Sequence, residues 1–354
     1  MKQQRLLALD ALRGIAAIAV LFHHGERELH SSLGFAYGYL SVDIFFLMSG
    51  FVIAQAYEPR MAAGMSFGRF VKLRFARLYP MMLLGALLGI AVFAARGGNG
   101  PTLWLAGASA LLMVPLVWSG AVLFPVNIPE WSIFFEIVTN LFHRLALPWL
   151  GRRMLAATIA LSLLLLGVAG WKLHGLANGF SPFTFWGGFP RAFFSYFVGV
   201  LICRTAPQWR PHVPALPLPL LLAGFLVVVL GEAALGEHVR ASVYWLFAVM
   251  LVFPAGLMLL VRANVPGWME RPAEWLGDLS YPLYAVHMPL LVLAAPLVLP
   301  LPFATRQALT VLAAAVIAII ALLLDRGYDR PMRRILQIGR RGKALKADVN
   351  VAAP

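Results

Sequence analysis

Long apolar runs, each interrupted by a short polar or Gly/Pro-containing stretch, recur along nearly the whole chain. A helix needs about 20 predominantly apolar residues to cross a membrane, and ten runs approach that length. They lie near residues 6–24, 37–57, 78–95, 131–150, 154–172, 189–204, 217–234, 242–262, 280–300 and 307–325. The pattern predicts an all-α fold, a polytopic bundle of about 10 spanning helices.

An eleventh apolar stretch, at residues 102–118, is ambiguous by hydropathy, so the distribution of basic residues decides its placement. If the N-terminus is cytoplasmic and this stretch does not cross, the Lys and Arg residues outside the first helix divide into 22 cytoplasmic and 6 outer ones; if it crosses, the division is 11 and 17. Because short cytoplasmic loops are enriched in Lys and Arg, the first arrangement is favoured. We therefore expect both termini in the cytoplasm, and residues 97–130 as an outer loop with a re-entrant or interfacial segment.

The composition excludes a soluble domain. Of 354 residues, 61% are hydrophobic and only 12% are charged, and the mean hydropathy is +0.80. The single cysteine, Cys203, excludes an intramolecular disulfide and a multi-cysteine metal site. The net charge of +14 comes mostly from basic residues beside apolar runs, which favours anionic lipid headgroups over nucleic acid as the interacting surface.

No internal repeat divides the chain. We interpret residues 1–326 as one transmembrane domain and residues 327–354 as a basic cytoplasmic tail. The first apolar run lacks a small-residue cleavage site, so it is interpreted as a first spanning helix and not as a removed signal peptide.

Two ionisable residues lie within this first run. Arg13 and His24 are eleven positions apart, which is close to three helical turns, so both lie on one helix face about 16 Å apart along the axis. Asp10 shares that face, whereas His23 does not. Because an ionisable side chain at membrane depth is costly, the pair marks a candidate functional site.

The predicted topology gives a depth to the other polar residues. Glu136 and Asp43 are expected near the outer ends of their helices, Glu136 about 8 Å or less below the outer boundary and level with His24. His287 is expected in the inner half or the middle of the bilayer. Between the second and third spans, RFVKLRFARLYP forms a basic cytoplasmic segment with Arg69, Lys72, Arg74 and Arg77.

Each of these residues also has a structural interpretation. His24 suits the membrane interface, Arg13 can pair with Asp10, and Glu136 can cap a helix or pair locally. The basic segment is typical of a topology signal, and His287 of a buried hydrogen-bonding histidine. The sequence alone leaves these alternatives open.

Five segments together resemble one family. In chain order they are LDALRGIAAIAVLFHH, SVDIFFLMSGFVIA, FVKLRFARLYP, EWSIFFE and LGDLSYPLYAVHMPLL. From about residue 6 to 325 the chain resembles the integral-membrane acyltransferase-3 family of O-acyltransferases. The resemblance implies transfer of an acyl group, usually acetyl from cytoplasmic acetyl-CoA, to a sugar hydroxyl of a polysaccharide, lipopolysaccharide, peptidoglycan or other glycan, and in some members to a small molecule such as a macrolide.

The chemistry of acyl transfer suits the residues already singled out. A hydroxyl that attacks a thioester must lose its proton to a base, and we assign that role to His24, aided or oriented by Glu136. A covalent acyl-histidine relay is the alternative. We expect Arg74 and Arg77 to bind the phosphates of coenzyme A at the cytoplasmic side. Arg13 is expected to bind the donor deeper in the membrane domain. Supporting positions are assigned as follows: Asp10, Asp43, Ser280, Tyr281 and His287.

Two other function classes suit the same composition. A proton-coupled transporter would use the same intramembrane charges as its pathway, and a non-catalytic assembly component would only bind a lipid-linked glycan. For the enzyme, the expected partners are membrane lipids, acyl-CoA and a glycan or glycolipid acceptor in the bacterial inner membrane. We expect no nucleic-acid partner, no metal and no permanently bound cofactor; the oligomeric state, including a homo-oligomer, is left open.

Overall fold

The fold is a bundle of helices, as the apolar runs predict. The computed structural model describes residues 7–118, 121–173, 178–230 and 238–338, and no strand occurs in these ranges. The helices longer than a few residues are α1 (Leu7–Glu28), α2 (Ser41–Ala62), α3 (Phe67–Ala95), α4 (Gly100–Leu112), α5 (Glu130–Ala146), α6 (Arg152–Lys172), α7 (Phe185–Arg204), α9 (Leu218–Leu230), α10 (His238–Phe247), α11 (Phe253–Val261), α12 (Gly267–Val298), α13 (Phe303–Leu324) and α14 (Arg330–Ile338).

Within the described residues, each of the ten predicted spans overlaps a helix or, for 242–262, the continuous stretch from α10 through a π-turn to α11. Residues 231–234 of the span predicted at 217–234 lie outside the described residues. In the described part of the chain, eight helical stretches are long and apolar enough to cross a membrane, and α9, with 13 residues, is a shorter apolar helix. The amphipathic α5 has 17 residues. The chain is a multi-pass membrane protein.

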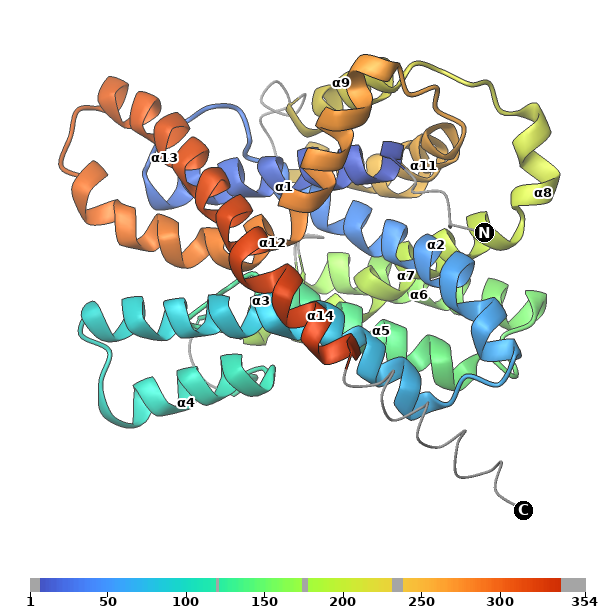
Figure 1. Ribbon diagram of the computed structural model, residues 1–354, viewed down its shortest axis with the longest axis horizontal. Helices are drawn as coiled ribbons and strands as arrows, with labels where there is room; N and C mark the ends of the chain where they lie inside the picture. Colours follow the sequence, from blue (N-terminus) through green and yellow to red (C-terminus); the bar gives the residue numbers. More distant parts are fainter. Residues whose placement is uncertain (1–6, 119–120, 174–177, 231–237, 339–354) are drawn as a thin grey trace.

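α1 occupies the centre of the bundle and lies alongside α12 (Figure 1). Gly14 permits this approach, because a Cβ there would collide with the backbone of Leu276. Small residues at helix contacts are typical of membrane bundles, where the backbones approach closely. Glycines also allow α2 and α7 to pack closely. A Cβ on Gly50 would collide with the backbone of Tyr196, and a Cβ on Gly199 would collide with the backbone of Leu47.

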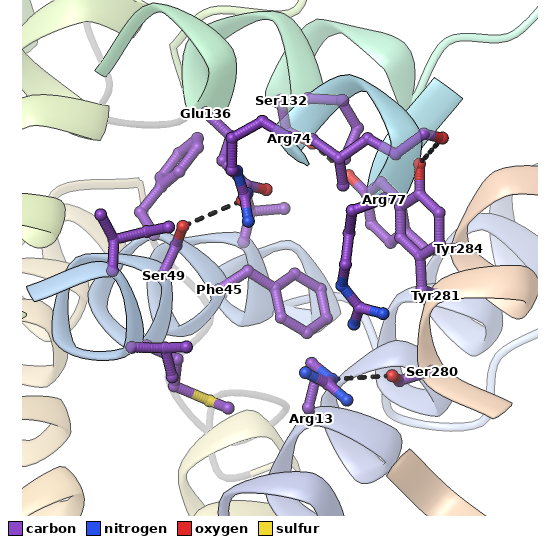
Figure 2. Close-up of a pocket in the computed structure, with 17 residues that line it drawn as sticks. Arg13, Phe45, Ser49, Arg74, Arg77, Ser132, Glu136, Ser280, Tyr281 and Tyr284 are labelled. Carbon is purple, nitrogen blue, oxygen red and sulfur yellow. Dashed lines mark hydrogen bonds and ion pairs between the residues drawn. The ribbon is translucent and has the colours of Figure 1, made fainter. Parts of the chain in front are cut away.

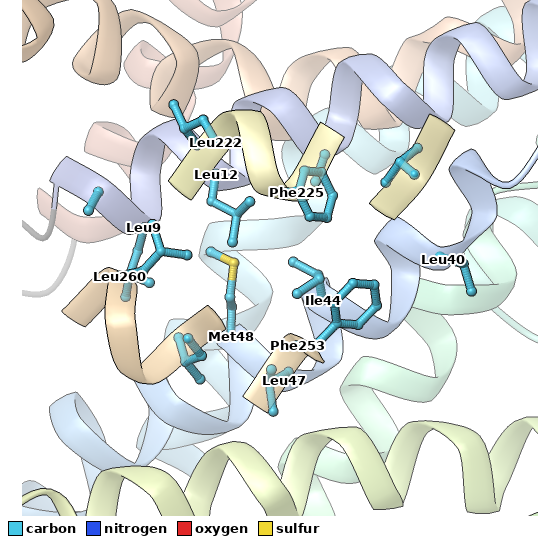
Figure 3. Close-up of a cluster of buried hydrophobic side chains, with 14 of the residues drawn as sticks. Leu9, Leu12, Leu40, Ile44, Leu47, Met48, Leu222, Phe225, Phe253 and Leu260 are labelled. Atoms are coloured by element: carbon cyan, nitrogen blue, oxygen red, sulfur yellow. The ribbon is translucent and has the colours of Figure 1, made fainter. Parts of the chain in front are cut away.

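An apolar cluster fills the space between the first two helices and α9 and α11 (Figure 3). Leu12 of α1, Ile44 of α2, Phe225 of α9 and Phe253 of α11 are all buried within it. The cluster holds α1 and α2 from one side, which leaves their polar faces free to contact α3, α5 and α12.

The doubtful segment does not form a spanning helix. α4 has 13 residues, so it rises only about 20 Å. It packs against α3, where the Tyr79 hydroxyl donates to the Leu111 carbonyl oxygen at 3.1 Å. The chain then enters the bundle, and Asn127 Nδ2 donates to the Ala285 carbonyl oxygen of α12 at 3.1 Å. Residues 100–118 and 121–129 therefore form a re-entrant segment, and α5 begins at the buried Glu130 inside the bundle.

The last spanning helix continues beyond the expected domain boundary at residue 326. α13 passes through a π-turn at Asp325–Asp329 into α14. Arg333 binds Asp325 at 3.1 Å and Asp329 at 2.6 Å, and Arg330 binds Asp325 at 2.5 Å, so two guanidinium groups pair with the two acids at this turn. Residues 339–354 of the predicted basic tail lie outside the described residues.

The arrangement makes the orientation testable. The α2–α3 connection lies at one end of the bundle and the α3–α4 connection at the other (Figure 1). With Cys203 replaced by alanine, we expect Asn99→Cys to react with a membrane-impermeant maleimide in intact cells, and Ala63→Cys to react only after permeabilisation. Both positions are exposed. The reverse labelling pattern would contradict a cytoplasmic α2–α3 connection.

Candidate active site

Five helices surround a cavity of about 160 Å³ in the middle of the bundle (Figure 2). α1, α2, α3, α5 and α12 each contribute side chains to it. Its polar lining consists of Arg13, Ser49, Arg74, Arg77, Ser132, Glu136, Ser280, Tyr281 and Tyr284. The structure thus brings together residues that are as much as 271 positions apart, between Arg13 and Tyr284.

Arg13 is fixed between α1 and α12. Its Nε donates to Ser280 Oγ at 2.9 Å, and its Nη2 donates to the Gly277 carbonyl oxygen at 3.3 Å. Nη2 also binds Asp10 Oδ1 at 2.9 Å, so the predicted pair on one face of α1 is confirmed. The guanidinium is held by a neighbouring carboxylate and still lines the cavity.

Arg74 and Arg77 reach the cavity from the first turns of α3. Arg74 Nη2 binds Glu136 Oε1 at 2.6 Å, and that carboxylate oxygen also accepts a hydrogen bond from Ser49 at 2.9 Å. The other two cations of the basic segment, Arg69 and Lys72, are exposed and do not line this cavity. Helical periodicity accounts for the division, because residues 74 and 77 are three positions apart and share a face.

The charge of the cavity is positive. Three guanidinium groups line it, but Glu136 is the one carboxylate among the lining side chains. Tyr281 lies beside them, and its hydroxyl donates to the Leu78 carbonyl oxygen. A polyanionic ligand that presents phosphates is the natural complement, because guanidinium groups bind phosphate oxygens bidentately.

His24 does not line this cavity but lies beyond it, toward the C-terminal end of α1. Its ring lies 5.3 Å from that of His287, centroid to centroid. The His287 ring is in turn 5.8 Å from that of Tyr284, which lines the cavity and whose hydroxyl is 2.5 Å from Ser132 Oγ. A continuous set of contacts therefore joins the arginine cavity to the histidine pair.

The hydrogen bonds of His287 determine its tautomer. Nδ1 lies 3.1 Å from the Leu283 carbonyl oxygen and 3.0 Å from that of Tyr284. Since both partners only accept, Nδ1 carries the proton and Nε2 carries the lone pair. Nε2 is buried and has no hydrogen-bond partner among the described residues. His287 is thus a buried hydrogen-bonding histidine, one of its two proposed interpretations, and it also keeps an acceptor beside His24.

The expected depth of Glu136 is wrong. It binds Arg74 in the arginine cavity and does not lie level with His24. The expectation assumed that the span at 131–150 begins at the outer surface, whereas α5 begins inside the bundle after the re-entrant segment. Glu136 consequently lies closer to the other end of the bundle.

The expected depth of His287 also needs correction. It contacts His24 near the C-terminal end of α1, the end that the predicted topology places outside, and so does not lie in the expected inner half. The predicted helix starts at residue 280, but α12 starts at Gly267 and reaches His287 about 30 Å along its axis. The hydropathy pattern does not reveal residues 267–279 of this helix, because they include several polar side chains.

Asp43 lies near the start of α2 as expected, but it does not line the arginine cavity. Its two carboxylate oxygens accept from Arg191 Nε at 3.0 Å and Nη2 at 2.7 Å, and both side chains are buried. Arg191 comes from the predicted span at 189–204, and sequence reasoning missed it. The signal was present, since Arg191 is an ionisable residue inside an apolar run.

Two more polar clusters were missed. His143, buried on α5, lies 2.8 Å from Glu58 Oε1, and Arg204 of α7 also binds Glu58. Near α12, Asn127 Nδ2 donates to Glu130 Oε1 at 3.1 Å. These contacts fix both ends of α5 and so hold Glu136 against Arg74.

Comparison with known proteins identifies the family of this chain. The model of the acyltransferase domain of type 3 matches residues 6–325. The chain therefore belongs to the acyltransferase-3 family, and it is a membrane O-acyltransferase. This membership removes the support for the transporter and for the non-catalytic component. No solved structure matches the chain.

Three relatives illustrate the range of the family. Protein 2 in the picA locus of Rhizobium radiobacter is 38% identical over 156 residues, covering 39% of this chain and 80% of that protein. Acyltransferase MdmB of Streptomyces mycarofaciens is 26% identical over 326 residues, covering 80% of this chain and 78% of that protein. The peptidoglycan O-acetyltransferase OatA of Listeria monocytogenes is 23% identical over 358 residues, covering 92% of this chain but 56% of that protein.

Proposed function

We propose that this protein lies in the bacterial inner membrane and transfers an acetyl group from cytoplasmic acyl-CoA to a sugar hydroxyl. The sugar belongs to a cell-surface polysaccharide, lipopolysaccharide or glycolipid. The observation that carries the proposal is the shared face of α1. Arg13 on this face lines a cationic cavity, and His24, eleven residues further along, lies at the histidine pair. The name of the Listeria relative, a peptidoglycan O-acetyltransferase, supports a glycan acceptor.

The donor is assigned to the arginine cavity. Coenzyme A carries its phosphates at one end and its thioester at the other, so an extended molecule suits a site whose cations and candidate base are well separated. Arg74 and Arg77 bind the phosphates near the cytoplasmic side, and Arg13 lines the path toward His24. Glu136 holds Arg74 in place, since its carboxylate accepts from that guanidinium.

The reaction needs a base next to the acceptor hydroxyl. His24 takes the proton from the hydroxyl while its oxygen attacks the thioester carbonyl carbon. A C–O bond forms, the C–S bond breaks, and the thiolate takes up a proton as free coenzyme A. His287 positions the His24 ring through their direct contact. In the alternative relay, the His24 nitrogen first accepts the acyl group and then releases it to the hydroxyl.

A reconstituted assay tests the function. Purified protein in lipid nanodiscs receives radiolabelled acetyl-CoA and the surface glycan fraction of a deletion strain. We expect thioester consumption that depends on the glycan, and a labelled, base-labile ester on it. A glycan ester content that is equal in the deletion and parent strains, together with no thioester consumption, would contradict the proposal.

A further inference from the structure

A second cavity, of about 300 Å³, lies beyond the histidine pair along α1 and α12, and neither histidine lines it. α1, α3, the re-entrant segment and the outer part of α12 all line it. Six of its side chains matter here: Glu28, Phe93, Arg96, Met288, Pro289 and Val292. Its volume lies at the lower end of the range of small-molecule sites, which is about 300–1,000 Å³.

The position of this outer cavity follows from two helices. On α1, Glu28 lies one turn beyond His24 and on the same face, so this face presents Arg13, His24 and Glu28 in succession. On α12, Met288 and Pro289 directly follow His287. The outer cavity and the arginine cavity therefore lie on opposite sides of the His24–His287 pair along the helix axes.

The lining of the outer cavity differs from that of the arginine cavity. It carries one acid and one base, Glu28 and Arg96, and these side chains make no hydrogen bond or ion pair with any other described residue. A carboxylate accepts hydrogen bonds from neighbouring hydroxyls, and a guanidinium donates to hydroxyl and ring oxygens. The ring of Phe93 and the side chains of α12 provide an apolar wall for the C–H face of a sugar. A neutral polyhydroxyl ligand suits this balance better than the polyanion that the three arginines favour.

We propose that the outer cavity binds the sugar unit of the acceptor glycan, with the hydroxyl to be acylated directed at His24. The inference rests on the proposed function and adds where the acceptor binds. Glu28 orients the sugar through hydrogen bonds to its hydroxyls, so that the proton leaving the reacting hydroxyl passes to His24. Donor and acceptor then reach the histidine pair from opposite sides.

Two variants and a matched control test the acceptor site. Glu28→Gln keeps the shape but removes the charge, and Val292→Trp fills the cavity. Leu293→Trp places the same bulk on the neighbouring side chain, which is 57% exposed and does not line the cavity. Each variant replaces the native copy in the deletion strain; mass spectrometry then measures the sugar esters, and calorimetry measures coenzyme A binding to the purified protein.

We expect at least a tenfold loss of sugar esters for Glu28→Gln and Val292→Trp, with unchanged coenzyme A affinity, and normal ester levels for Leu293→Trp. The unchanged affinity shows that the variants are folded. Normal ester levels in both cavity variants would overturn the acceptor site while leaving the proposed function intact. A wild-type protein that restores no ester to the deletion strain would overturn the proposed function, and this inference with it.

Discussion

Replacing His24 with alanine is expected to lower acyl transfer about 10²–10⁴-fold, the usual effect of losing a general base. The protein should still insert into the membrane, because alanine is readily accommodated in a spanning helix and the His24 ring makes no hydrogen bond to another described residue. Turnover of acetyl-CoA in the reconstituted assay measures the effect at equal amounts of purified protein.

His23→Ala is the matched control. The His23 ring lies 5.2 Å from the His24 ring between centroids, but it also contacts Tyr39 at 5.7 Å, and its Nδ1 lies 3.2 Å from the Phe35 carbonyl oxygen. His23 lines neither of the two cavities. We expect a smaller loss of transfer for this variant. Near-normal transfer by His24→Ala would remove His24 from the catalytic role.

The second large effect is expected at the arginine cavity. Hydrogen bonds to charged groups contribute about 1.5–3 kcal/mol each, so Arg74→Lys or Arg77→Lys should weaken coenzyme A binding about tenfold or more. Lysine keeps the charge but cannot bind a phosphate through two parallel N–H donors. Arg13→Lys should impair transfer even where the donor still binds. Calorimetry with coenzyme A on detergent-purified variants measures the affinities.

Exposed cations of the same segment provide the comparison. Arg69→Lys and Lys72→Arg change side chains that do not line the cavity, so they should leave the affinity unchanged. An Arg74/Arg77 double lysine variant that binds coenzyme A like the wild type would assign the basic segment to topology alone.

Much of the fold was predictable, because a spanning helix satisfies its own backbone and needs only an apolar run of sufficient length. The prediction of the fold fails where a segment is not a spanning helix with a sufficiently long apolar run. α4 and the following loop re-enter the bundle, where irregular backbone is tolerated because protein surrounds it. The N-terminal extension of α12, residues 267–279, is too polar to be recognised from hydropathy.

The site was predictable only within one helix. The Arg13–Asp10 pair and the common orientation of Arg74 and Arg77 follow from the helical period. The partner of Glu136 depends instead on where α5 begins, and the partner of Asp43 depends on the packing of α7 against α2.

The sequence by itself determined the membrane class, the helices, the shared face of Arg13 and His24, and the family resemblance, because these depend on local composition and on the period of a single helix. The tertiary structure alone decided that Glu136 binds Arg74, that His287 meets His24 and that Glu28 lines a separate outer cavity. The physical reason is that these contacts join different helices, whose relative depth is set by close packing at residues such as Gly14 and by the re-entrant segment.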